Sequence, residues 1–268
     1  MNKKLTSIIE AYCKVVEQGV NERWKRIPVE IYDSETYEVI GGLLSRQATL
    51  TIYLAFSPSI WNGHIAPLIL RSMIDAHITL SWILIKPKER AKKYILYGLG
   101  QEKLHIEHLK LKVNQKDQQV QQLIQAKEDW LKSQRLDFLT EVNVGNWAET
   151  TTRQMAIESK CESLYNFSYN AFSGPTHNMW QHISRYNLRH CNNPLHKYHR
   201  IPDIASVPPD IDYVFRSAKY INLSFAKVDK KFGLTIKTPM PLQYFLSKLN
   251  SLKKKGPPSK NCGSFCKR

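Results

Sequence analysis

The stretch Leu68-Ile69-Leu70-Arg71-Ser72-Met73-Ile74-Asp75-Ala76-His77 decides the fold, because it places charged and polar side chains inside an otherwise apolar run. An apolar run of this length predicts a helix that is buried among other helices. The interior of a helical bundle tolerates Arg71 and Asp75 only where they are paired or take part in function. The stretch therefore predicts both a helical core and a polar site within it.

Helical periodicity extends in both directions from this stretch, which predicts an all-α protein built as a multi-helix bundle. A long central helix pair follows Lys86-Pro87, with a polar turn near residues 114–119. We expect a single helical domain over residues 1–252 and a flexible basic tail over residues 253–268. Residues 190–209 contain four prolines and are expected to form a surface loop. The expected helices cover roughly residues 4–22, 34–56, 64–85, 87–135, 148–172, 175–188, 210–232 and 242–252.

The chain is strongly basic, with 39 Lys and Arg residues against 23 Asp and Glu residues and a formal net charge of +16. The tail supplies six of the positive charges, so the body of the protein is basic as well. Such an excess favours nucleic acid, nucleotides or another polyanion as the partner. A basic protein without a specific anion is the alternative.

The sequence also indicates the compartment. The N-terminus reads as an amphipathic helix and not as a signal peptide. The most apolar run, residues 65–85, is interrupted by Arg71, Asp75 and His77, which favours a buried helix over a membrane span. We therefore expect a cytoplasmic protein without a membrane partner.

The five cysteines are scattered, which indicates reduced thiols and no disulfide framework. Cys262 and Cys266 have a spacing that a metal could use, but one such pair supplies only two ligands. Further residues of ligand type are His190, Cys191, His196 and His199. No second close pair of cysteines occurs in the sequence, so we expect no metal and no cofactor.

Arg71 and Asp75 form the first candidate site. They lie one helical turn apart and can form an ion pair at i and i+4. We predict a catalytic role in which Arg71 binds an anion and Asp75 orients it. The alternative is a buried ion pair that only fixes helix packing. His77 is a further catalytic candidate, although six residues of unbroken helix rotate it by about 120° from Arg71.

The segment from Tyr169 to His177 contains the second candidate site. Gly174-Pro175 predicts a helix that begins at Pro175, with Ser173 or Gly174 as its cap. His177 would then lie in the first turn, where backbone N–H groups and the helix dipole favour an anion and a neutral imidazole. We predict catalytic roles, with His177 as a general base and Ser173 bound to a phosphate. The alternative is simple capping.

Basic and aromatic residues lie on and near the same expected helix. We predict that His182, Arg185 and Arg189, together with Tyr169, bind nucleic acid. Phosphates pair with such basic groups, and bases stack on such rings. The alternative is that the aromatic side chains only pack the core.

Two groups of residues, in this order along the chain, resemble a known family. The residues are Arg71, Asp75, Trp82 and Lys86-Pro87, followed by Tyr169, Ser173 and His177. Over roughly residues 37–189 the chain is similar to the bacterial domain-of-unknown-function family numbered 5677, in which Glu is common at the position of Asp75. The resemblance implies an all-helical domain without a settled activity. The Arg71-to-His77 spacing is also similar to the motif of the HEPN-type helical ribonucleases, which cleave RNA without metal.

We therefore expect a metal-independent ribonuclease, or another nucleic-acid-acting effector, of a bacterial defence or toxin system. Arg71 would hold the phosphate, and His177 or His77 would take the proton of a ribose 2′-hydroxyl. We expect RNA rather than DNA as the partner, and also a partner protein from the same operon or a second copy of the chain. The alternative is a non-catalytic helical module for nucleic acid or an acidic protein, in which the predicted site residues form a structural polar network.

Overall fold

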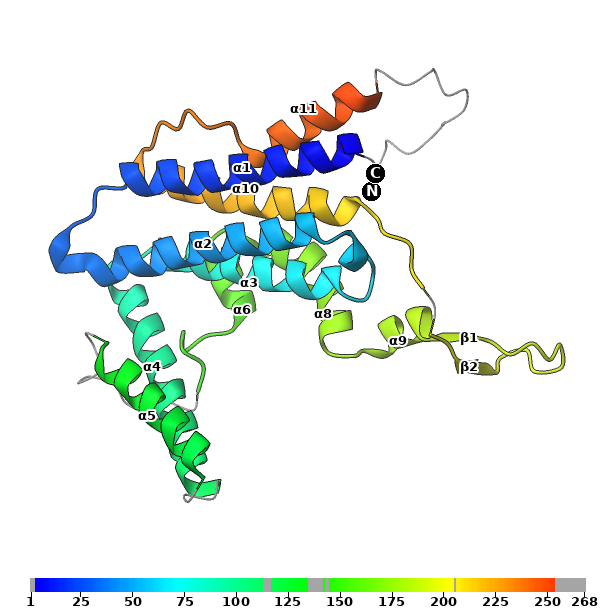
Figure 1. Cartoon of the computed structure of the whole chain (residues 1–268), viewed down its shortest axis with the longest axis horizontal. Helices are drawn as coiled ribbons and strands as arrows, with labels where there is room; N and C mark the ends of the chain where they lie inside the picture. Colours follow the sequence, from blue (N-terminus) through cyan, green and yellow to red (C-terminus); the bar gives the residue numbers. More distant parts are fainter. Residues whose placement is uncertain (1–2, 113–116, 135–141, 143–144, 205, 254–268) are drawn as a thin grey trace. The chain divides into compact units, whose positions relative to one another are not determined.

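The computed structural model describes residues 3–112, 117–134, 142, 145–204 and 206–253. Most of these residues are helical, and the described strands form one short two-stranded sheet (Figure 1). The predicted all-α class is therefore confirmed. The predicted tail lies outside the described residues from position 254 onward.

The chain forms two compact units. Unit 1 consists of Met1–Ile27, Leu44–Ile74 and Asn170–Arg268, and unit 2 consists of Pro28–Leu43 and Asp75–Tyr169. The elements of unit 1 are α1 (Lys3–Arg26), the later part of α2 (Ser34–Phe56), η2 (Pro58–Ile60), the earlier part of α3 (Ala66–Ile83), α8 (Asn170–Thr176), α9 (Trp180–Tyr186), β1 (Leu188–His190), β2 (Arg200–Pro202), α10 (Asp212–Phe232) and α11 (Pro241–Lys253).

Helices α1, α10 and α11 pack side by side in unit 1 (Figure 1). The buried side chains of α10 recur every three or four residues, which is the pattern of a helix with one apolar face. Gly19 of α1 allows the Phe225 ring of α10 to come close, because a Cβ atom at Gly19 would lie 2.8 Å from Phe225 Cε2.

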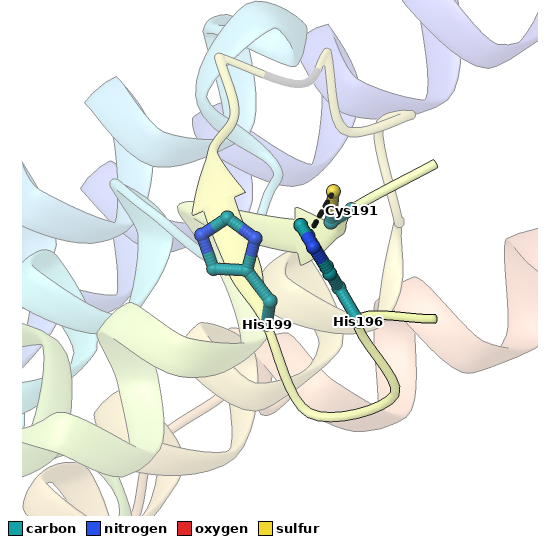
Figure 2. Close-up of side chains that lie close together, drawn as sticks. All are labelled: Cys191, His196 and His199. Carbon is teal, nitrogen blue, oxygen red and sulfur yellow. Dashed lines mark hydrogen bonds between the residues drawn. The ribbon is translucent and has the colours of Figure 1, made fainter. Parts of the chain in front are cut away.

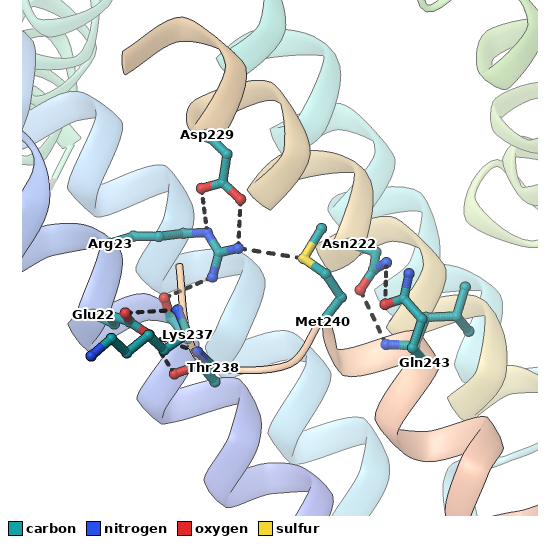
Figure 3. A network of polar contacts seen from close by, with 10 residues as sticks. Glu22, Arg23, Asn222, Asp229, Lys237, Thr238, Met240 and Gln243 are labelled. Atoms are coloured by element: carbon teal, nitrogen blue, oxygen red, sulfur yellow. Dashed lines mark hydrogen bonds and ion pairs between the residues drawn. The ribbon is translucent and has the colours of Figure 1, made fainter. Parts of the chain in front are cut away.

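A buried arginine joins α1 to α10 (Figure 3). Arg23 is 1% exposed, and its Nε and Nη2 atoms donate to the two carboxylate oxygens of Asp229 at 2.8 and 2.7 Å. Its Nη1 donates to the carbonyl oxygen of Gly19 at 2.9 Å, and the guanidinium lies 3.8 Å from the centre of the Phe225 ring. The charge of Arg23 is thus paired and hydrogen-bonded, as a buried cation requires.

Glu22, the neighbour of Arg23, fixes the segment that leads into α11 (Figure 3). Its carboxylate accepts the backbone N–H groups of Lys237 and Thr238 at 2.9 and 2.8 Å, and the Thr238 hydroxyl at 2.7 Å. These hydrogen bonds favour the charged form and lower the pKa of Glu22 from 4.5 to about 2. The link joins residues more than 200 positions apart.

Unit 2 contains the predicted long helix pair. Its elements are η1 (Ile31–Asp33), the earlier part of α2, the later part of α3, α4 (Pro87–Lys112), α5 (Gln118–Lys132), α6 (Thr152–Glu158), α7 (Glu162–Leu164) and the π-helical turn η4 (Tyr165–Tyr169). Helices α4 and α5 pack along their lengths through Leu99, Ile106, Ile124 and Leu131. Asp117 caps α5 by accepting the Gln119 N–H at 2.9 Å.

The two helices predicted over residues 148–172 and 175–188 differ from the structure. Lys160 has a φ of 59° just after α6, which ends that helix. Pro175 lies in the last turn of α8 and does not begin a helix. Asn178 has a φ of 51°, and the Met179 N–H donates to the Gly174 carbonyl at 2.9 Å, in the manner of a helix C-terminus. A proline in the last turn of a helix removes only one helical hydrogen bond and is therefore tolerated. The prediction that a helix begins at Pro175 is wrong for this reason.

The predicted loop over residues 190–209 contains β2, the returning strand of a β-hairpin. Leu188 pairs with Pro202, Arg189 with Ile201 and His190 with Arg200 in an antiparallel ladder. The hairpin directly follows α9 along the chain (Figure 1). Pro202 is tolerated because it lies at the end of an edge strand.

One described segment, Ile31–Phe56, is long and apolar enough to cross a membrane by length and composition. Half of its most apolar window is buried inside the protein, as is usual for a core helix. A single helix of this kind is only weak evidence that the chain crosses a membrane.

Candidate nucleic-acid interface

Arg71 and Ser173 lie together in unit 1. The Arg71 Nε donates to the Ser173 Oγ at 3.1 Å, and both residues are 8% exposed. Arg71 belongs to α3 and Ser173 to the middle of α8. This contact joins the two candidate segments, although its side chains are largely closed to solvent.

Asp75 and His77 follow Arg71 on the same helix. Asp75 is half-buried one turn later, and its pairing with Arg71 stays a prediction. His77 is 2% exposed in unit 2, where its Nε2 lies 3.5 Å from Ser81 Oγ and 3.6 Å from Cys161 Sγ. An imidazole held in this way packs a core, and it is poorly placed to reach a nucleic-acid strand.

His177 is exposed just after the end of α8, and its backbone N–H donates to the Ser173 carbonyl at 3.0 Å. The expectation that His177 lies in the first turn of a helix is wrong. The C-terminal end of a helix carries the negative pole of its dipole, which favours a cation. The anion-binding argument for His177 therefore does not hold.

Two hollows on unit 1 share Gly63, Tyr186 and Tyr213, and we call them together the aromatic groove. The larger measures about 680 Å³ and the smaller about 170 Å³. The larger hollow is also lined by Leu5, Pro58, Trp61, Asn62, Val207, Pro208, Pro209, Asp210 and Ile211. The smaller hollow is also lined by Pro67, Ala171, Phe172, Gly174, Pro175, Gln181, His182 and Arg185. One part of the groove is thus mainly apolar, and the other carries basic side chains.

Three rings form a cluster beside the smaller hollow. The His64 ring centre lies 5.7 Å from that of His182 and 5.2 Å from that of Tyr186, and the His182 and Tyr186 centres are 4.8 Å apart. Arg185 lines the same hollow from α9. Two imidazoles and a guanidinium therefore stand close together at one end of the aromatic groove.

The pKa of His182 is lowered from its ordinary value of 6.5, first by burial and then by the nearby His64 and Arg185. His182 is accordingly neutral near pH 7, and a neutral imidazole can accept a proton or a hydrogen bond. Its neighbours His64 and Arg185 offer hydrogen-bond donors to an anion in the same place.

Gly63 is required by the close approach of Tyr186. A Cβ atom at Gly63 would lie 2.5 Å from both Cε1 and Cζ of the Tyr186 ring. No side chain fits there unless the ring moves, so Gly63 leaves the room that Tyr186 occupies in the groove.

The four predicted nucleic-acid-binding residues lie in three different places. His182 and Arg185 line the aromatic groove. Arg189 is exposed on β1, where its Nη1 donates to Asn192 Oδ1 at 3.1 Å. Tyr169 belongs to unit 2, where its ring stacks on Tyr165 with centres 4.5 Å apart.

The sequence analysis did not assign a functional role to His64, Trp61 or Tyr213. His64 lies more than 100 residues before its ring partners, so no local spacing pointed to the cluster. The one available signal was the run Trp61-Asn62-Gly63-His64, in which polar and aromatic residues precede the apolar helix.

These features define an all-α protein with a basic and aromatic groove. The chain belongs to a family of unknown function (DUF5677), whose model matches residues 37–194. The match covers more than half of the chain and confirms the resemblance drawn from Arg71, Asp75, Tyr169, Ser173 and His177. No curated protein and no solved structure matches the chain.

Proposed function

We propose that the protein binds single-stranded RNA in the aromatic groove and cleaves it without a metal ion in the reaction. The observation that carries this proposal is the cluster of His64, His182 and Arg185 at one end of an apolar and aromatic hollow. A phosphodiester suits the basic end, and an unpaired base suits the apolar part next to it.

Charge and shape support binding. The net charge of +16 attracts a polyanion from a distance, and Arg185 can pair with one phosphate at the groove. Tyr186 and Tyr213 line the larger hollow as half-buried rings that can stack with a base, whereas Trp61 lines it as a buried side chain. An open single strand can present its bases to such a hollow, whereas a duplex keeps them stacked and paired.

The two imidazoles support a cleavage step. His182, kept neutral by its lowered pKa, takes the proton from a ribose 2′-hydroxyl, and the 2′-oxygen attacks the adjacent phosphorus. The bond from phosphorus to the 5′-oxygen breaks, and His64 donates a proton to that leaving oxygen. Arg185 balances the charge that grows on the phosphoryl oxygens. The products are a 2′,3′-cyclic phosphate and a 5′-hydroxyl.

Arg71 and Ser173 act in this proposal as positioning residues. Ser173 lies between Phe172 and Gly174, which both line the smaller hollow. Arg71 lies one turn after Pro67, which lines the same hollow from α3. Their hydrogen bond therefore fixes two walls of the groove relative to each other.

The experiment incubates the purified full chain with end-labelled single-stranded RNA, duplex RNA and single-stranded DNA, in the presence of EDTA. We expect cleavage of single-stranded RNA only, with cyclic phosphate ends. His182→Asn and Arg185→Ala should each lower the cleavage rate by about 100-fold or more. His105→Asn and Arg153→Ala, at exposed positions in unit 2, are the matched controls and should keep the rate.

If the wild type binds RNA through Arg185 but does not cleave it, the protein is a non-catalytic binding module and not a ribonuclease. This second function is favoured by the burial of Arg71 with Ser173 and of His77 with Cys161, which is typical of a structural polar network. Absence of both binding and cleavage would contradict both functions.

A role in bacterial defence or toxicity is part of the proposal. A ribonuclease without a required metal can act on cellular RNA as soon as it is released from control, for instance by a partner protein from the same operon. Induced expression of the wild type should therefore stop growth, and expression of His182→Asn should not. Equal growth of both strains at equal protein levels would remove this part of the proposal.

A further inference from the structure

The hairpin that follows α9 carries three side chains of metal-ligand type. Cys191 comes directly after β1, and His196 and His199 come before β2. Figure 2 shows the three side chains grouped on the loop that joins the strands. Cys191 is half-buried, and both histidines are exposed.

The distances in this group suit one small cation. One ligand atom from each side chain lies within 4.8 Å of the others. The Cys191 Sγ and the His196 Nδ1 are 3.7 Å apart. A tetrahedral zinc ion with its usual bond lengths to sulfur and nitrogen places these two atoms about 3.6 Å apart. The pair therefore already has the separation of two ligands of one ion.

The backbone of the loop brings the ligands together. The Cys191 N–H donates to the His199 carbonyl, the His199 N–H to the His196 carbonyl, and the His196 N–H to the Asn193 carbonyl, each at 3.0 Å. These hydrogen bonds close the loop and hold the three side chains near one another. An ion can therefore bind with little rearrangement of the backbone.

Two further contacts of Asn193 suit a bound metal. Its backbone N–H donates to the Cys191 Sγ at 3.5 Å and so helps to hold the sulfur in place. Its side-chain nitrogen lies 3.3 Å from His196 Nε2, the ring nitrogen that does not face Cys191. A contact at the second ring nitrogen fixes the orientation of a histidine ligand.

We propose that Cys191, His196 and His199 bind one Zn²⁺ ion, with water in the fourth position. A thiolate and two imidazoles are ligands that zinc prefers, whereas calcium and magnesium take oxygen ligands. The spacing is Cys, four residues, His, two residues, His. We expected no metal from the sequence because it holds no second close pair of cysteines, but a single cysteine with two histidines suffices when a hairpin brings them together.

A zinc ion bound at the hairpin would also support α9, the helix that lines the smaller hollow of the aromatic groove. The Asp203 N–H donates to the Asn187 carbonyl at 2.9 Å, and Arg200 Nη1 donates to the Ser184 carbonyl at 3.2 Å. Both contacts link the returning strand to α9 or to the residue just after it, and α9 carries His182, Arg185 and Tyr186. Zinc bound at the hairpin would therefore order a segment that contacts α9, and the proposed cleavage step needs no metal.

The test uses the full chain, freed of metal by a chelator under reducing conditions and then titrated with Zn²⁺ and with Co²⁺. We expect one equivalent to bind. Cobalt should give a thiolate-to-metal charge-transfer band and the intense d–d bands of a four-coordinate ion. Cys191→Ser, His196→Gln and His199→Gln should each weaken zinc binding by 100-fold or more, and Cys191→Ser should also remove the charge-transfer band.

Two control variants locate the site. His190→Gln changes an exposed histidine next to Cys191, and the double variant Cys262→Ser, Cys266→Ser removes the tail cysteines. Both should bind zinc like the wild type. Failure of the wild type to bind one equivalent would overturn the proposal, and so would unchanged binding by Cys191→Ser or loss of binding by the tail variant. The readout is metal binding, so the result does not depend on whether RNA is cleaved.

Discussion

The Nε atom of Arg71 donates a hydrogen bond to the Oγ atom of Ser173 at 3.1 Å, across 102 positions of the chain. Both side chains are largely closed to solvent, so the contact joins α3 to α8 in the interior of unit 1. A buried hydrogen bond of a charged group specifies which helices are neighbours, because the group is costly to bury elsewhere. Arg71 and Ser173 thus help to build the groove.

Removal of this hydrogen bond should destabilise the protein. We expect Arg71→Ala to lower the free energy of unfolding by about 1.5–3 kcal/mol, the usual value for a buried bond to a charged group. A double-mutant cycle with Ser173→Ala, measured by urea unfolding, should give a coupling energy of about 1 kcal/mol. Arg46→Ala, at an exposed position on α2, is the control and should change stability by less than about 0.5 kcal/mol. Strictly additive effects of Arg71→Ala and Ser173→Ala would contradict a direct contact.

Arg23 should not be replaceable by lysine. Its planar guanidinium bonds both oxygens of Asp229, and a lysine ammonium cannot reproduce that fork. We expect Arg23→Lys to cost about 3 kcal/mol, because it disturbs a buried pair. Arg26→Lys should have almost no effect, because the Arg26 side chain is 40% exposed in its pair with Glu22. Equal urea midpoints for the two variants would contradict a buried, two-pronged hydrogen bond between Arg23 and Asp229.

Acid should weaken the link between α1 and the segment before α11. The pKa of Glu22 is about 2 in the folded protein against an ordinary value of 4.5, so its contribution to stability is complete above pH 4.5. That contribution is lost as the pH falls from 4.5 toward 2, because the unfolded chain takes up the proton first. Thermal unfolding of Glu22→Gln should therefore depend less on pH in this window than that of the wild type. Glu17→Gln, at an exposed position on α1, should follow the wild-type profile.

A methyl group at Gly63 should disturb the aromatic groove. Gly63→Ala places a carbon 2.5 Å from the Tyr186 ring, so the ring must move away from His64 and His182. We expect RNA affinity to fall by about tenfold and stability to fall by about 1–3 kcal/mol, the usual cost of overpacking. Gly42→Ala has no atom within 4 Å of the new carbon and should keep both properties. Fluorescence anisotropy with labelled RNA measures the affinity, and equal values for both variants would show that Tyr186 is not needed.

Binding and cleavage of RNA should depend on pH in opposite directions. A bound phosphate favours protonated His182, so its pKa is higher in the complex than in the free protein, where burial, His64 and Arg185 lower it. Binding then takes up a proton, and affinity rises as the pH falls from 8 to 5. On the acidic side of its pH profile, the cleavage rate at saturating RNA should instead rise with pH, because His182 must be neutral to act as the base. His182→Asn should flatten the binding profile, and an unchanged profile in this variant would exclude His182 as the titrating group.

Several features could be predicted from local sequence. The helix pair α4 and α5 follows from apolar residues at helical spacing and from Asp117 as a cap. The site was only partly predictable. Arg71 stood out because a charge in an apolar helix needs a partner, and His182 because it lies at helical spacing from Arg185 and Arg189. His64 looks like an ordinary polar residue in the sequence. The start of a helix at Pro175 was predicted wrongly, because proline suits the first turn but is also tolerated in a last turn.

The sequence by itself determined that this protein is all-α, that α3 is a core helix with a buried arginine, and that the chain belongs to the DUF5677 family. These properties depend on periodicity and on short motifs, which neighbouring residues encode. Only the tertiary structure decided that Arg23 pairs with Asp229, that His64 meets His182, and that Cys191 meets His196 and His199. The first two contacts join residues more than 100 positions apart, and the third depends on a strand pairing. Such proximity results from the packing of whole elements, which no local pattern records.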